Sequence, residues 1–258
     1  MNDKIIAVCS SIVGSVRKHN EDNFYFAGHE RCLEEEQNLK MTIKDGDVIS
    51  VFDGMGGESL GDIASLTASV TLRDYLEHNK YFDWKEYVNL ANEAVLTKAS
   101  KNEIVGTTLA GLFLNGNDIE ICNVGDSKIF GLKGKNLIQL SIDDNEELMN
   151  KKLGINRKGA LTQHLGLKDD EIEIIPHIKQ FSKQEFDKII ICSDGLTDMV
   201  EKKEITSILL NNKLEDSIKL LIDKVKEQGA KDNTTIIIMA KRKEKRNFLR
   251  IFKRRKEK

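Results

Sequence analysis

Proline is almost absent from this chain of 258 residues, in which Pro176 is the only example. Proline-rich linkers, internal repeats and low-complexity blocks are also missing up to residue 240, so nothing marks a boundary between domains. Residues 241–258 differ in composition because Lys and Arg dominate them. The sequence therefore predicts one domain over residues 1–240 and a basic tail over residues 241–258, either disordered or bound to a surface.

Closely spaced cysteines and long apolar runs are missing too. The four cysteines are far apart and form no C-x-x-C pair, a pattern typical of reduced thiols rather than of a disulfide framework. No apolar run approaches the roughly 20 residues that a membrane helix needs. The N-terminus shows no apolar segment with a cleavage site. These absences predict a cytoplasmic protein.

Charge is nearly balanced overall but unevenly distributed. The 40 basic and 42 acidic residues give a net charge of -2. Residues 241–258 hold eleven Lys or Arg against two Glu, a local charge of +9, which leaves -11 for residues 1–240. An acidic body favours divalent cations as ligands, and a basic tail favours an anionic partner.

The hydrophobic pattern gives both strand and helix signals. Short apolar runs separated by turn residues predict strands at 5–9, 48–52, 107–114, 119–124, 128–132, 137–141, 171–178, 188–192 and 234–239. Apolar residues at helical spacing predict two helix pairs, 59–79 with 84–101 and 202–210 with 214–227. Hairpin strands pair antiparallel. The pattern therefore favours an α+β fold of stacked antiparallel sheets with helices packed outside.

Aspartates beside the apolar strands carry the functional signal. Asp53 and Asp194 each follow a strand and precede a glycine, whereas Asp126 follows a strand and a glycine. Asp232 comes before the last strand, and the acidic pair Glu21-Asp22 comes before another. One Asp-Gly pair is most simply a turn, but several carboxylates gathered at one edge repel each other unless cations neutralise them. Oxygen ligands without His or Cys favour Mg or Mn over Zn.

At these residues the chain resembles the metal-dependent protein phosphatases, the type 2C serine/threonine phosphatases, and specifically their bacterial branch. Seven segments match the family in its order: RKHNEDN (17–23), VFDGMGG (51–57), GTTL (106–109), NVGDSK (123–128), LTQHLG (161–166), SDGLTD (193–198) and KDNTT (231–235). Each segment alone is a weak signal, whereas seven in order are specific. The family fold is a four-layer α-β-β-α sandwich, two antiparallel sheets flanked by helix pairs, which agrees with the predicted elements.

The resemblance implies a set of metal ligands for two tightly bound Mn or Mg ions. Asp53 corresponds to the ligand that bridges both ions. The first ion is completed by Asp194 and Asp232, and the second by Glu21, the carbonyl of Gly54 and, through water, Asp22. Asp126 corresponds, with Asp194, to a weaker third site. Arg17 corresponds to the arginine that binds the substrate phosphate.

The implied reaction is hydrolysis of phosphoserine and phosphothreonine in proteins by direct attack of a hydroxide that bridges the two ions. Two cations lower the pKa of a shared water, and a guanidinium fork fits two phosphate oxygens. No phosphoenzyme is needed, in agreement with the absence of the Cys-x5-Arg motif of cysteine phosphatases. Such an enzyme opposes a bacterial serine/threonine kinase.

Several residues depart from the family pattern or receive no role. Met55 stands where many eukaryotic members have a histidine thought to protonate the leaving group, so the general acid is left open between a metal-bound water and, less favoured, His19. His164 is interpreted as structural or associated with the flap. Lys128 replaces the arginine that usually follows Gly-Asp-Ser and is expected to face solvent. Residues 106–108 are interpreted as a packing signature.

Residues 142–158 occupy the place of the family's flap, a mobile segment beside the active site. The segment is short and its start is acidic, so we expect it to hold the third ion weakly. The basic tail is either a solvated segment or, because apolar residues at 248–252 lie among its charges, a segment that touches an anionic membrane or an acidic protein. Nucleic acid is not expected, since stacking aromatics and a matching basic face are not evident. We expect a monomer.

Two rival functions compete with an active phosphatase. An inactive relative that binds phosphoproteins usually loses metal carboxylates, yet all six predicted carboxylate ligands are present here. A phosphatase dedicated to an anti-sigma-factor antagonist usually carries a sensory domain, and none is visible. The sequence therefore favours an active phosphoprotein phosphatase.

Overall fold

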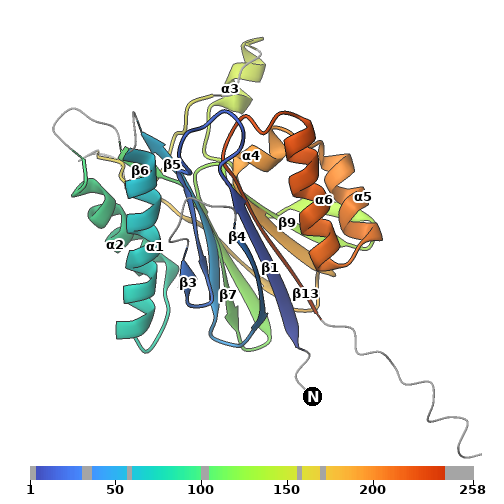
Figure 1. Ribbon diagram of the computed structural model, residues 1–258. Coiled ribbons are helices and arrows are strands. Elements are labelled where there is room, and N and C mark those ends of the chain that lie inside the picture. The colour runs from blue at the N-terminus through green and yellow to red at the C-terminus, as the bar shows by residue number, and fades with distance from the viewer. Residues whose placement is uncertain are drawn as a thin grey trace, which may run out of the picture.

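The computed structural model describes residues 4–30, 37–56, 60–99, 105–155, 159–168 and 173–241. Two antiparallel sheets lie between helices that cover their outer faces (Figure 1). The predicted α+β sandwich of two antiparallel sheets with flanking helices is thereby confirmed. Within the described residues, no helix has the length and apolar character that crossing a membrane requires.

The first sheet joins the beginning of the described chain to its end. Its strands, in spatial order, are β10 (Asn136–Gln139), β9 (Lys128–Lys133), β12 (Lys188–Cys192), β13 (Thr234–Lys241), β1 (Ile5–Ile12) and β4 (Gln37–Ile43). The first strand, β1, pairs with the last, β13, in antiparallel register from Ile5 opposite Lys241 to Ile12 opposite Thr234. The outer face of this sheet packs against the helices α4 (Asp194–Thr197), α5 (Lys202–Asn211) and α6 (Leu214–Glu227).

The second sheet is built mainly from hairpins. Its strands, in spatial order, are β11 (His177–Ser182), β8 (Asp118–Val124), β7 (Leu109–Asn115), β5 (Val48–Gly56), β2 (Asp22–Phe26) and β3 (His29–Glu30), with β6 (Val105–Thr107) paired to the end of β5. Its outer face packs against α1 (Leu60–His78) and α2 (Trp84–Leu96). A short helix, α3 (Glu147–Lys152), lies in the segment between β10 and β11.

Local sequence explains how the helix pair on the second sheet forms. Asp83 caps α2, because its carboxylate accepts hydrogen bonds from the N–H groups of Lys85 and Glu86, which the first helical turn leaves without partners. Trp84 follows directly and packs, fully buried, against Gly111 of β7. A Cβ at Gly111 would lie 2.3 Å from the Trp84 ring. Glycine is therefore required where this helix meets the sheet.

Three layers of apolar side chains separate the four layers of secondary structure. The central layer lies between the sheets and includes Phe24, Ile129 and Ile191, all essentially inaccessible to water. The other two lie between each sheet and its helices. Burial on this scale fixes the strands rigidly, and the loops at their ends inherit that rigidity.

The structure differs from the sequence prediction at several elements. β3 and α3 were not predicted, and the strand predicted at 107–114 is divided between β6 and β7. Two further strands also differ. β4 was not predicted, although Leu39, Met41 and Ile43 alternate with polar residues along it. The strand predicted at 171–178 lies instead at His177–Ser182, and residues 169–172 are outside the described residues. Pro176 explains the shift, because proline has no N–H to donate to a neighbouring strand.

Candidate active site

The predicted ligand residues lie at one end of the two sheets. Asp22 begins β2 and faces Asp53 of β5 in the antiparallel register. Asp126 lies in the turn between β8 and β9, Asp194 begins α4 directly after β12, and Asp232 precedes β13. Asp53 lies within its strand and not after it, as the sequence had suggested, because β5 continues to Gly56. Five segments thus bring carboxylates to the same end of the sandwich.

Electrostatics at Asp53 show how close these carboxylates are. Burial raises the pKa of Asp53 well above its usual value, and the charges of Asp194 and Asp22 raise it further. Asp126 and Asp232 act in the same direction. A buried carboxyl surrounded by four others favours the protonated form unless a cation is near.

Asp22 is also buried and is repelled by neighbouring carboxylates, but hydroxyl groups donate hydrogen bonds to it. Its Oδ2 accepts a hydrogen bond of 2.7 Å from Ser193 Oγ. Burial raises the pKa of Asp22 to about 7, although hydrogen bonds from Ser193 and Thr235 act in the opposite direction. Asp22 is therefore buried and held by hydroxyl groups, and its action on an ion through water stays a prediction.

Two threonines of the 106–108 segment hold the Asp53 backbone. The Asp53 N–H donates to Thr108 Oγ1 at 3.0 Å. The Thr108 N–H and the Thr107 hydroxyl both donate to the Asp53 carbonyl, at 2.9 and 3.0 Å. The segment is buried, as expected for packing, but it also fixes the position of the central aspartate.

Glu21 and Gly54 meet at the start of α1. The Gly54 N–H donates to the Glu21 carbonyl at 3.2 Å. A Cβ on Gly54 would lie 2.1 Å from the carbonyl oxygen of Gly61 and 2.5 Å from that of Glu21, so no larger residue fits here. The Glu21 carboxylate lies against Gly61, and burial raises the pKa of Glu21. The two predicted ligands of the second ion are therefore neighbours in space.

Asn233 links the segment that carries Glu21 to the segment that carries Asp232. No role was predicted for Asn233 from the sequence. Its Oδ1 accepts from the Glu21 N–H at 2.9 Å, and its Nδ2 donates to the carbonyls of Val13 and His19. Asn233 thereby ties the 13–21 loop to the residue after Asp232. The Asp-Asn pair was the available signal, because a buried amide beside a carboxylate needs several partners.

Arg17 contacts two of the predicted ligands. Its Nη2 lies 2.9 Å from Asp232 Oδ2, and its Nη1 lies 3.7 Å from Glu21 Oε2. The hydrogen bond to Asp232 raises the pKa of Arg17. The guanidinium is about half exposed, with 47 % of its side-chain surface open to solvent. Arg17 is therefore at the mouth of the site, where a phosphate can reach it.

The donor set fits divalent metal ions with oxygen ligands. Among the residues that the structure describes, no three Asp, Glu, His or Cys groups converge closely enough to enclose one ion. Burial, and to a lesser extent the charges of neighbouring carboxylates, nevertheless raise the pKa of Asp22 and of Asp53. A hard cation relieves this repulsion, and carboxylate and carbonyl oxygens suit Mn or Mg.

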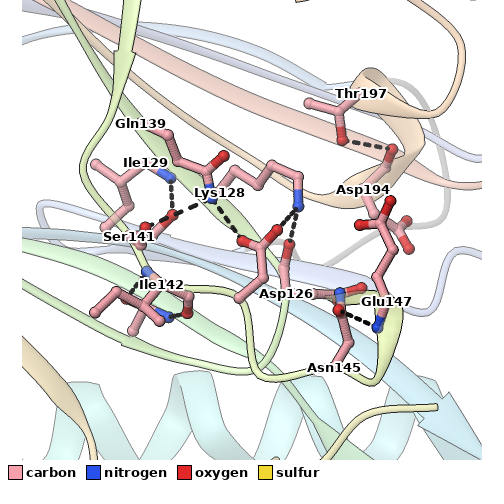
Figure 2. Close-up of polar contacts among 12 residues, drawn as sticks. Asp126, Lys128, Ile129, Gln139, Ser141, Ile142, Asn145, Glu147, Asp194 and Thr197 are labelled. Carbon is pink, nitrogen blue, oxygen red and sulfur yellow. Dashed lines mark hydrogen bonds and ion pairs between the residues drawn. The ribbon is translucent and has the colours of Figure 1, made fainter. Parts of the chain in front are cut away.

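Lys128 joins the Asp126 turn to the start of the flap (Figure 2). Its Nζ donates to the Asp126 carbonyl at 3.2 Å and lies 2.6 Å from Asp143 Oδ2. Gln139 also donates to the Asp143 carboxylate, at 2.7 Å. Only 16 % of the Lys128 side chain is exposed, so the expectation that it faces solvent was wrong. The sequence offered no signal for its partner fifteen residues away.

Asp144 makes a second connection between the flap and the same turn. Its Oδ2 accepts from the Gly125 N–H at 2.9 Å, and its own N–H donates to the Gly125 carbonyl at 3.0 Å. Its Oδ1 lies 2.7 Å from His177 Nε2 and accepts from Gln163 at 2.9 Å. The acidic start of the flap is therefore used internally to hold the loop that carries Asp126.

His164 lies beside Met55, next to Gly106. A Cβ on Gly106 would lie 2.4 Å from His164 Nδ1 and 2.9 Å from the Met55 methyl carbon. Burial lowers the pKa of His164, so the ring is neutral near pH 7. His164 therefore packs as a structural residue, in line with its interpretation from sequence.

Comparison with known proteins adds an independent observation. A family model described as Protein phosphatase 2C matches residues 38–235. The serine/threonine phosphatase stp of Listeria welshimeri is 31% identical over 247 residues, which cover 88% of this chain and 92% of that protein.

Solved structures share the fold at lower sequence identity. The Mycobacterium tuberculosis serine/threonine phosphatase PstP/Ppp has a TM-score of 0.74 at 22% identity, over 93% of this chain and 100% of that one. The catalytic domain of the phosphatase PstP in complex with 2 manganese ions has a TM-score of 0.72 at 23% identity, over 92% of this chain and 98% of that one.

Proposed function

The chain belongs to the protein phosphatase 2C family and is a metal-dependent serine/threonine protein phosphatase, and from this premise we propose which residues perform its chemistry. Asp53 is the central metal ligand. The observation that supports this is its burial, which raises its pKa, together with the charges of four other carboxylates, which raise the pKa further. A residue in such a place is stable as an anion only beside cations.

Two Mn or Mg ions are held at this end of the sheets. Asp194 and Asp232 complete the first site with Asp53, and Glu21 with the Gly54 carbonyl completes the second, with Asp22 acting through water. Asp126 and Asp194 offer a weaker third site. A relative's catalytic domain with two manganese ions supports this number. When bound, the ions supply a water of lowered pKa for attack on phosphorus.

The remaining side chains bind and orient. Arg17 binds the substrate phosphate, because its fork of N–H donors lies at the exposed mouth of the site and can donate hydrogen bonds to two phosphate oxygens. Thr107 and Thr108 hold Asp53 in place, and Asn233 holds Glu21. We assign protonation of the leaving group to water, since Met55 cannot donate a proton and His164 is neutral and buried.

Residues 1–240 form a single catalytic domain in this proposal, which acts as a monomer on phosphoserine and phosphothreonine proteins. Support for one domain comes from the pairing of β1 with β13, which joins the two ends of the described chain in the same sheet. The substrates are products of serine/threonine kinases, and the enzyme opposes such a kinase.

The test is Mn-dependent hydrolysis of p-nitrophenyl phosphate and of a phosphothreonine peptide by wild type, Asp53→Asn and Asp194→Asn. Each substitution removes a ligand, so kcat/KM should fall by more than the roughly 10–100-fold that loss of an outer partner costs. Asp223→Asn is the matched control, because Asp223 is an exposed aspartate of α6 outside the segments that match the family. Wild-type rates in both ligand variants would contradict the assignment.

A further inference from the structure

Two hydroxyl groups interrupt the apolar layer between the sheets at the end that carries the active site. Side chains alternate along a strand, so Ser11 points to the same face of β1 as Ala7 and Cys9, which belong to the central apolar layer. Thr235 of β13 lies directly opposite Ser11 in the antiparallel register. Both residues are completely buried. They need hydrogen-bond partners, because burying a hydroxyl without one costs free energy.

The partners form a cyclic network of hydrogen bonds that begins and ends at Asp22. The Asp22 N–H donates to Asn20 Oδ1 at 3.1 Å, and Asn20 Nδ2 donates to Ser11 Oγ at 3.0 Å. The hydroxyl oxygens of Ser11 and Thr235 lie 2.8 Å apart, and the Thr235 hydroxyl is hydrogen-bonded to the Asp22 carboxylate. We call these four residues the Asp22 network.

The chemistry of these groups determines the direction of each hydrogen bond. An ionised carboxylate only accepts, so the Thr235 hydroxyl donates its one proton to Asp22. The Ser11 hydroxyl must then donate to Thr235, while its oxygen accepts from the Asn20 amide. Each hydroxyl therefore donates one hydrogen bond and accepts one. All the bonds point the same way around the network, and such chains of hydrogen bonds strengthen one another in a low dielectric.

Ser193 attaches the Asp22 network to a neighbouring segment of the site. Its hydroxyl donates to Asp22 Oδ2 at 2.7 Å, and its oxygen accepts from the Thr235 N–H at 3.0 Å. The Ser193 N–H also donates to the Thr235 carbonyl at 3.1 Å. Asp194 follows Ser193 directly. Asp22, in the second sheet, is thereby joined to β1 and β13 of the first sheet and to the segment of Asp194.

We propose that Ser11 and Thr235 are positioning residues that act on the metal site through Asp22, a role that rests on the proposed function of Asp22 as a ligand of the second ion through water. Asp22 is paired with Asp53, the proposed bridging ligand, in the register of β2 and β5. Hydroxyl donors give the Asp22 carboxylate a fixed orientation. Binding of an ion depends on that orientation, because outer hydrogen-bond partners set the geometry of metal ligands.

A purely structural role for these hydroxyls has different consequences. Loss of a buried hydrogen bond would then lower the free energy of unfolding and leave the affinity for metal ions unchanged. Positioning through Asp22 instead lowers the affinity for the ion to which Asp22 contributes and leaves the affinity for the other ion. Thermal unfolding and metal binding must therefore be measured on the same variants.

Calorimetric titration of the metal-free full chain with Mn tests the proposal, with Tm in EDTA measured alongside. Thr235→Val removes the hydroxyl at nearly constant volume, Thr235→Ser retains it, and Ser11→Ala removes the next hydroxyl of the network. The adjacent positions supply matched controls, Ser10→Ala and Thr234→Val. Ser10 and Thr234 are also completely buried, but their hydroxyl oxygens have no hydrogen-bond partner among the residues that the structure describes.

We expect wild type and both controls to bind two Mn ions tightly. In Thr235→Val one of the two binding steps should weaken by about tenfold, as for loss of an outer partner, while the other stays near wild type. Ser11→Ala should weaken the same step to a smaller extent, because it acts one hydrogen bond further from Asp22. Thr235→Ser should restore the affinity of wild type.

Asp22→Asn shows whether the effect passes through Asp22. Thr235→Val added to Asp22→Asn should weaken Mn binding no further, because residues of one network are not additive. Additive effects would overturn the proposal, as would equal Mn affinities in Thr235→Val and Thr234→Val. If Thr235→Val does not fold, Ser11→Ala against Ser10→Ala decides in the same way. A wild type that binds no Mn would contradict the proposed function itself, and the positioning role with it.

Discussion

Arg17 contacts Asp232, a carboxylate that we propose as a metal ligand. Its contact with Asp232, at 2.9 Å, satisfies the ligand when no ion is there. Once an ion binds Asp232, the guanidinium is free to turn to a phosphate. In this proposal Arg17 and the cations compete for the Asp232 carboxylate. A substrate phosphate then offers the guanidinium other oxygen acceptors.

Replacement of Arg17 should separate metal binding from substrate binding. In Arg17→Ala the affinity for Mn should rise several-fold, because a competing cation is removed, whereas kcat/KM should fall by about a hundredfold through loss of phosphate contacts. Calorimetric titration with Mn and steady-state kinetics measure the two effects. Arg17→Lys keeps the charge without the fork, so its Mn affinity should stay near that of wild type. Weaker Mn binding by Arg17→Ala would show that the contact with Asp232 supports the site instead.

Sequence patterns located the charged residues of the site but not the residues that hold them. Asp53 and Asp194 each stand between an apolar run and a glycine, a local signal that sequence carries. Lys128 and Asn233 act through partners that only the fold brings near: Asp143 for the first, and the 13–21 loop for the second. Such partnerships cross between strands, and spacing along one chain does not encode them.

At the scale of elements, the turn of Asp126 and the start of the flap behave as one unit. The Lys128 ammonium joins Asp143 to the Asp126 carbonyl, and Asp144 exchanges two hydrogen bonds with Gly125. The Asn123 side chain adds two more to Ile142. A displacement of the flap therefore displaces Asp126, and the proposed third ion should respond to contacts that never touch it.

Loss of the Lys128 ammonium should loosen this unit. In Lys128→Met, the Mn concentration that half-saturates the weak site should rise several-fold, while the two tight sites keep their affinity. Amide hydrogen exchange over residues 139–145 should become faster, which reports the loosening apart from activity. Lys133→Met is the matched control, since its contact with a described residue is an exposed ion pair of 3.5 Å with Glu185. If exchange and Mn dependence match the control, Lys128 does not couple the two segments.

The hydrophobic periodicity of the sequence predicts most helices and strands, because each of them buries one face. The helices on both outer faces and the strands around Asp53 and Asp194 are of this kind. β4 escaped prediction although it alternates polar and apolar residues and precedes an Asp-Gly turn, because as an edge strand it lacks the continuous apolar run of the strands inside the sheets. β11 was displaced because a single proline ends one apolar run just before the strand begins.

At the scale of the whole molecule, folding concentrates like charge at one end of the sandwich. Asp22 and Asp53 are buried there with raised pKa values, so the metal-free fold holds these carboxylates at a cost. Unfolding relieves this cost by returning them to water. The free energy of unfolding of the metal-free protein therefore depends on pH, and that of the metal-bound protein depends on the concentration of divalent cations.

The sign of the pH dependence follows from the pKa of Asp22, about 7 in the folded protein against about 3.9 in an unfolded chain. Between these pH values the metal-free folded state binds more protons than the unfolded state. The contribution of Asp22 to the free energy of unfolding is therefore fully present below about pH 4 and is lost as pH rises through 7. Melting in EDTA should accordingly give a Tm that falls from pH 5.5 to pH 8. Asp22→Asn should flatten that slope, whereas Asp223→Asn, at an exposed position of α6, should leave it unchanged.

Manganese should act in the opposite direction, because cations bind the ionised carboxylates of the folded state alone. At a concentration one hundred times Kd, each site contributes about 2.7 kcal/mol, which corresponds to an increase in Tm of roughly 5–10 °C for a domain of this size. The increase should be larger at pH 8 than at pH 5.5, since protons compete with Mn at the lower pH. A Tm in EDTA that does not change with pH, together with an equal effect of Mn at both pH values, would mean that the buried carboxylates are not the groups that bind the metal.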